Sequence, residues 1–178
     1  WAPENAFAFH NWWHLALFHM DRADWERALA RYDANIHPGP TPFALPLVDA
    51  TALLWRLVLE GVDVGRRFDT VADEWEAWLP TDRGFYAFND VHAMLAFVAT
   101  GRERATKQLL DALEAAAAQA GTNAMMSRDV GLPLATGIVA FGRGRHADAI
   151  AAIEPMRDHA HRFGGSHAQR DLLTLTMI

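Results

Sequence analysis

The chain has 178 residues and no cysteine, with 51% hydrophobic and 21% charged residues and a formal net charge of -6. This length suits one compact domain or a few small repeats, and the composition is typical of a folded protein. The negative charge disfavours binding to nucleic acid or to anionic membranes. The lack of cysteine excludes disulfides, thiolate metal sites and cysteine nucleophiles.

Targeting and membrane-spanning signals are not evident in the sequence. The longest uncharged apolar run, over residues 130–142, is too short to cross a bilayer and contains Pro133 and several glycines. The chain begins at Trp1 without a methionine and stops at Ile178 within an apolar pattern, so we expect a piece of a longer protein. The cytoplasm is the default expectation for its location.

Apolar residues recur at intervals of three and four and strand signals are scarce, so the sequence predicts an all-α chain. Turn residues divide it into helix pairs, and Pro80 is expected to end one of the helices. An S-x-x-Q capping box at Ser166 and Gln169 is expected to start a fifth pair. The predicted helices cover roughly 6–20 and 24–36, 46–60 and 66–79, 86–100 and 103–120, and 130–142 and 146–161.

The pattern of a helix, a short turn and a second helix recurs at intervals of roughly 40 residues, which is typical of helical-repeat proteins. Residues 22–33 and 143–154 place Ala28 and Ala149 at the same position, as in the second helix of a tetratricopeptide (TPR) hairpin. By the same spacing, Gly137 takes the small-residue position of its hairpin. We therefore predict an α-solenoid of about four TPR-like hairpins plus the start of a fifth, in a single domain over residues 1–178.

Several blocks of the chain resemble the tetratricopeptide repeat protein 38 family. They are HNWWHLALF (10–18), LVDATALLWRLVLEGVDVG (47–65), FNDVHAMLAFVATGR (88–102), VGLPLATGIVAFGRG (130–144) and AHRFGGSHAQRD (160–171). The resemblance implies a TPR-like helical fold and, because members of that family are longer, repeats missing at one or both ends. It brings no biochemical activity with it.

The first predicted helix carries two stripes of side chains about 100° apart. One stripe is assigned to packing, and the other to the concave groove of the solenoid. The packing stripe is Trp12, Leu15, Ala16 and His19, and the groove stripe is His10, Trp13, His14 and Leu17.

Within the groove stripe, His10 and His14 have the i, i+4 spacing that can bind one metal ion together. Asn11 stands where a metalloprotease would have its glutamate. A metal would need further ligands from other helices, with Asp49, Asp90, His92 and His167 as candidates. The alternative is an aromatic and imidazole pair that lines the groove without a metal, and we predict neither a metal nor a cofactor.

Two further groups of polar residues lie in apolar surroundings. Asp49 and Arg56 are isolated charges that either pair across helices or bind a ligand. In the block over residues 159–171, Arg162, His167 and Arg170 surround two glycines ahead of a predicted helix. This pattern indicates either a site for a carboxylate or phosphate, or a connection in which the glycines only make the turn.

These features favour a binding module whose concave groove takes a peptide or a partner protein. The alternative is a small-molecule-binding protein or enzyme, with a histidine as acid or base and an arginine holding a small anionic ligand. A third possibility is self-association through apolar faces at the ends of the chain. The expected groove residues are His10, Trp13, His14, Asp49, His92, Arg162, His167 and Arg170.

Overall fold

The computed structural model describes residues 5–178, and within these residues every regular element is helical. The all-α prediction is therefore confirmed. No helix in the described part of the chain combines the length and the apolar character needed to cross a membrane. The first two helix pairs are α1 (Ala8–Asp21) with α2 (Trp25–Arg31), and α3 (Ala44–Leu59) with α4 (Arg67–Asp82).

The remaining helices follow the same plan as far as residue 163. A π-helical turn, η1 (Tyr32–Ile36), extends α2, and a 3₁₀ helix, η3 (Glu154–Phe163), extends α9. These later helices are α5 (Ala87–Ala99) with α6 (Glu103–Ala117), and then α7 (Thr122–Met126), the π-turn η2 (Ser127–Gly131) and α8 (Leu132–Gly142), followed by α9 (His146–Ile153).

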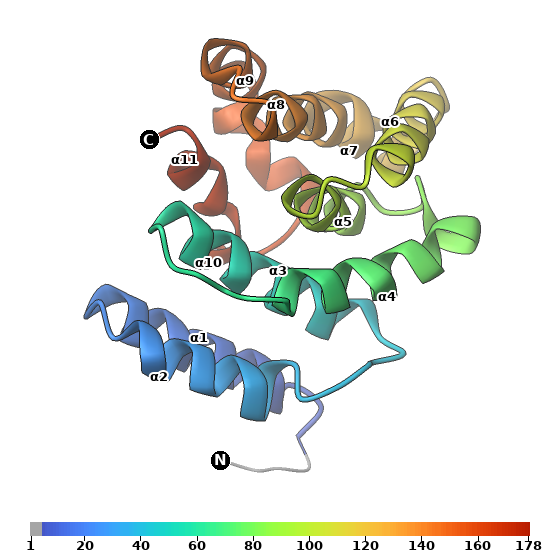
Figure 1. The fold of residues 1–178 in the computed structure, drawn as a ribbon. Coiled ribbons are helices and arrows are strands. Elements are labelled where there is room, and N and C mark those ends of the chain that lie inside the picture. The colour runs from blue at the N-terminus through green and yellow to red at the C-terminus, as the bar shows by residue number, and fades with distance from the viewer. Residues whose placement is uncertain (1–4) are drawn as a thin grey trace.

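The first helices of successive pairs form a continuous layer. α1 contacts α3, α3 contacts α5, and α5 contacts α8, so these four helices follow one another through the molecule, as Figure 1 shows. We call the surface that they share the inner face. α3 and α5 lie in the middle of this layer and are buried on almost every side, over residues 47–57 and 87–97.

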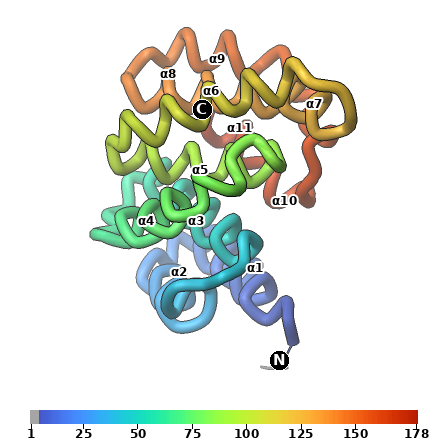
Figure 2. The backbone as a smooth tube through the Cα atoms, turned by 90° about the vertical axis from the view of Figure 1, so that its right-hand side faces the viewer, coloured from blue at the N-terminus to red at the C-terminus, as the bar shows by residue number. Residues whose placement is uncertain are grey.

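The chain after residue 163 turns back onto the inner face. Gly164 and Gly165 make the turn with φ of +95° and +76°, a conformation that favours glycine. Two short helices follow, α10 (His167–Arg170) and α11 (Leu172–Thr176). We call residues 166–176 the C-terminal segment. α11 contacts α3 and α8, and both views show the segment beside these helices (Figures 1 and 2).

Two predicted helix boundaries are wrong. Pro80 does not end α4, which continues to Asp82. The disturbance stays within the last turn, where the hydroxyl of Thr81 donates to the carbonyl of Trp78 and Arg83 donates to that of Leu79. The helix predicted from residue 130 belongs to a longer helical stretch that begins with α7.

Close approach of the helices in the last pair depends on a glycine. A Cβ atom on Gly137 would lie 2.5 Å from Cγ1 of Ile153 and 3.2 Å from the carbonyl oxygen of Ala149. Ile153 is completely buried, so α8 and α9 are in direct contact there. Gly137 thus occupies a position where only a small residue fits, as the spacing predicts.

Arginines near the turns join neighbouring helix pairs through ion pairs that water can reach. The linked groups belong to successive helix pairs: Arg67 lies at the start of α4, while Arg102 and Arg143 lie in the turns that precede α6 and follow α8. The pairs are Arg67 with Asp33 (2.6 Å), Arg102 with Asp73 (2.5 Å) and Glu76 (2.6 Å), and Arg143 with Glu103 (2.8 Å).

Candidate functional site

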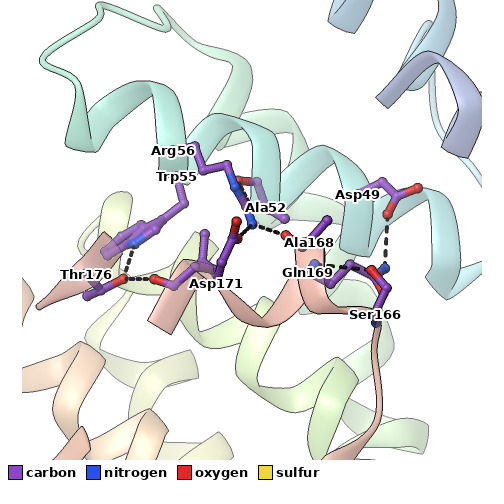
Figure 3. Close-up of polar contacts among 10 residues, drawn as sticks. Asp49, Ala52, Trp55, Arg56, Ser166, Ala168, Gln169, Asp171 and Thr176 are labelled. Carbon is purple, nitrogen blue, oxygen red and sulfur yellow. Dashed lines mark hydrogen bonds and ion pairs between the residues drawn. The ribbon is translucent and has the colours of Figure 1, made fainter. Parts of the chain in front are cut away.

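Polar side chains gather where α1, α3 and the C-terminal segment meet. α3 contributes Asp49 and Arg56, which are two helical turns apart and therefore lie on the same side of the helix. Both are buried in a helix that is otherwise almost entirely apolar. Figure 3 shows that both side chains meet groups of the C-terminal segment.

Asp49 joins α1 to the C-terminal segment. Its carboxylate is fully buried, with Oδ2 2.8 Å from Nδ1 of His10, while Oδ1 accepts a 3.4 Å hydrogen bond from the Gln169 amide. Burial raises the pKa of Asp49, and the hydrogen bond to this carboxylate raises the pKa of His10. Since Nδ1 of His10 faces the carboxylate, Nε2 is the ring nitrogen left for another partner.

His14 lies beside His10, as the i, i+4 spacing predicts. Their ring centroids are 4.8 Å apart in an edge-to-face arrangement. Burial, with a smaller contribution from the neighbouring His10, lowers the pKa of His14. The two imidazoles therefore have opposite shifts, because only His10 contacts the carboxylate of Asp49.

Trp13 does not line an open groove, which corrects the assignment of the two stripes on α1. Trp13 is completely buried, whereas Trp12, assigned to packing, is only partly buried. α1 contacts both α2 and α3, so the covered side of the helix lies between the two stripes and takes Trp13 from one and Ala16 from the other. The Trp13 ring stacks on His10 at 5.4 Å between centroids.

Arg56 is the main contact between α3 and the C-terminal segment. It is 4% exposed and donates to the carbonyls of Ala52 (3.0 Å) and Ala168 (2.5 Å) and to the carboxylate of Asp171 (2.5 Å). Its guanidinium also lies 5.4 Å from the centroid of the Trp13 ring. Burial lowers the pKa of Arg56 and Asp171 opposes that shift, so the carboxylate favours the charged form.

His92 lies under the C-terminal segment rather than beside His10. Its Nδ1 is 2.7 Å from the carbonyl of Phe88, and its buried Nε2 has no hydrogen-bond partner. His92 lines a void of about 10 Å³ together with Gln169 and the apolar residues Leu172 and Leu173 of the segment. Burial lowers the pKa of His92 to about 4, so this imidazole is neutral near pH 7.

The other predicted site residues are engaged elsewhere. Arg162 pairs with Asp129 at 3.1 Å, and Arg170 donates to the carbonyls of the two turn glycines. His167 is exposed next to Arg170. The structure thus brings together His10, Trp13, His14 and Asp49 and leaves His92, Arg162, His167 and Arg170 apart from them.

Asp90, the remaining candidate metal ligand, holds the loop before α5. Its carboxylate accepts a 3.0 Å hydrogen bond from the Gly84 amide, and burial raises its pKa to about 7. Throughout residues 5–178, no three histidine, aspartate or glutamate side chains are grouped so that they could hold a metal ion.

Sequence reasoning missed Gln169 and Asp171 as members of the site. Gln169 is predicted only as the end of a capping box, which the structure confirms. The Ser166 hydroxyl accepts a hydrogen bond from the backbone N–H of Gln169, and the side-chain oxygen of Gln169 accepts one from the backbone N–H of Ser166. The side-chain amide nitrogen of Gln169 remains available for Asp49. The only sequence signal for Asp171 was its place in the polar block over residues 159–171.

A large open cavity lies next to the Arg56–Asp171 pair, at the C-terminal ends of α1 and α3. Its volume is about 950 Å³, and its walls include the apolar residues Leu17, Met20 and Phe141. The groups gathered at the inner face can form hydrogen bonds and ion pairs with a short segment of chain. No family model and no solved structure matches this chain.

Proposed function

We propose that this chain is a TPR-like helical-repeat module, an α-solenoid within the cytoplasm, that binds a short peptide or a segment of a partner protein on its inner face. The observation that carries the proposal is that the inner face already holds a short helical segment through side-chain contacts, those of Asp49 and Arg56. Docking of a helix into a groove is a common mode of peptide recognition.

The packing of the helix pairs supports the TPR-like part of the proposal. Ala28 and Ala149, which take equivalent positions in the first and last pairs, are both buried. Gly137 lets α8 and α9 come into contact, as the small residue of a TPR hairpin does. These features agree with the resemblance to the tetratricopeptide repeat protein 38 family, which stays a prediction from the sequence.

A selection experiment tests peptide binding. A displayed library of peptides of about 15 residues, long enough for about four helical turns, is selected on the purified chain, and the affinity of each selected peptide is measured by fluorescence anisotropy. We expect His14→Ala, on the inner face, to weaken binding by about 10-fold, equivalent to about 1.4 kcal/mol. His146→Ala, at an exposed position of α9, is the matched control. Failure to select any peptide, or equal effects of both variants, would contradict the proposal.

A second candidate is a small-molecule site in which His10 acts as a base. The buried Asp49 carboxylate on its Nδ1 favours this candidate, because such a partner fixes the tautomer and orientation of the ring. Native mass spectrometry of the purified chain should then show a bound compound that Asp49→Asn loses. A spectrum of the protein alone, together with an unchanged His10 pKa in Asp49→Asn, would count against this candidate.

A further inference from the structure

The C-terminal segment has little structure of its own. α10 has only 4 residues, far fewer than an isolated helix needs to be stable in water, and a turn at Asp171 separates it from α11. The two glycines with positive φ separate it from η3. Its conformation therefore depends on the surface that it covers.

Both polar and apolar contacts hold the segment on that surface. Arg56 of α3 binds the carbonyl of Ala168 and the carboxylate of Asp171. Farther along, the indole of Trp55 donates a 3.0 Å hydrogen bond to the Thr176 hydroxyl. Between these contacts the segment buries the two adjacent leucines Leu172 and Leu173.

The surface below the segment is more polar than a permanent core requires. Asp49, Arg56 and His92 are buried there, and a buried charge can often be replaced by an apolar residue without loss of stability. His92 Nε2 has no partner while the segment is in place. All three groups lie against the segment, Asp49 and Arg56 through hydrogen bonds and His92 across a small void, so the face suits both a covered and an open state.

We propose that residues 166–176 are an intramolecular ligand of the inner face, and that an external partner of this face is a short helix of the same chemistry. Such a helix carries a carboxylate that replaces Asp171 on Arg56, followed directly by two leucine-like residues. The inference rests on the proposed binding function, and it adds that the partner competes with the chain's own segment.

Hydrogen exchange of the unaltered chain, followed by mass spectrometry, tests whether the segment leaves the face. The amides of 167–176 should exchange about 100-fold faster than those of 93–97 in α5, because the segment detaches while the core stays folded. Equal exchange rates in the two regions would show that the segment opens only with the whole fold, and would overturn the proposal.

A peptide of residues 164–178 with an N-terminal fluorophore tests binding in trans. The chain variant Asp171→Ala with Leu172→Ala weakens the resident segment, so it should bind this peptide about 10-fold more tightly than the unaltered chain does. A peptide with Asp171→Asn should bind about 5-fold more weakly than the native peptide, because the partner of Arg56 loses its charge.

The matched control is Glu114→Ala with Ile150→Ala, which removes an exposed acid and an exposed aliphatic residue away from the segment and should leave peptide binding unchanged. Circular dichroism verifies that the variants fold. If the segment variant does not fold, hydrogen exchange of the unaltered chain tests the proposal instead. If library peptides bind the inner face but the segment peptide does not bind the folded segment variant, this inference fails and the binding function stands. If neither binds, both fail.

Discussion

Two buried groups on α5 should make the stability of this chain respond to acid in opposite directions. Asp90 has a pKa of about 7, raised by burial and to a lesser extent by Asp82. His92 has a pKa of about 4, lowered by burial and to a lesser extent by Arg56. In the unfolded chain their pKa values return to about 3.9 and about 6.5. Both groups therefore take up their protons at different pH in the folded and unfolded states.

The sign of each group's contribution to the free energy of unfolding depends on whether the folded or the unfolded chain takes up the proton at the higher pH. Between pH 7 and pH 4 the folded chain protonates Asp90 before the unfolded chain does, which stabilises the fold by about 3 kcal/mol at pH 4 relative to pH 7. Over the same range the unfolded chain protonates His92 first, which destabilises the fold by about 3 kcal/mol. The two contributions nearly cancel in the unaltered chain.

Single substitutions should expose each contribution. Urea unfolding at pH 7 and pH 4, followed by circular dichroism, gives the change in the free energy of unfolding for each variant. Relative to the unaltered chain, the free energy of unfolding of Asp90→Asn should fall by about 3 kcal/mol more on acidification, and that of His92→Gln should fall by about 3 kcal/mol less. Other titrating groups are common to all three proteins. Identical pH dependence in the three would refute the pKa assignments.

Two packing predictions are checked by urea unfolding at pH 7. Trp13→Ala should lower the free energy of unfolding by about 3 to 5 kcal/mol, because the Trp13 side chain is completely buried. Trp12→Ala should lower it less, because Trp12 is only partly buried, and equal losses would contradict the corrected orientation of α1. Gly137→Ala should lower the free energy of unfolding by about 1 to 3 kcal/mol because the new Cβ meets Ile153. In Gly39→Ala the new Cβ has no atom within 4 Å, so this variant should lose little stability. An unchanged stability of Gly137→Ala would disprove tight contact between α8 and α9.

Local patterns in the sequence were enough to predict the helix pairs and one N-terminal helix cap. The apolar spacing predicts the helix pairs, and the capping box at Ser166 depends only on residues three apart. The burial of Trp13 depends on two neighbouring helices that cover α1 at once, which its own periodicity does not reveal.

The polar contacts of the site are long-range, and this is why the sequence did not predict them. Arg56 and Asp171 are 115 residues apart in the chain. Nothing in the spacing near either residue indicates that the chain turns back after its last helix pair. The i, i+4 pair of His10 and His14 was predictable, whereas the carboxylate that distinguishes their pKa values comes from another helix.

The arginine ion pairs between neighbouring helix pairs have a mechanical consequence. Arg67, Arg102 and Arg143 hold helices of successive pairs together through groups that water and salt can reach. Salt weakens exposed ion pairs but leaves buried apolar contacts between the inner helices largely unaffected. Successive helix pairs should therefore move more easily relative to one another as ionic strength rises, because the ion pairs weaken while the apolar contacts between the inner helices persist.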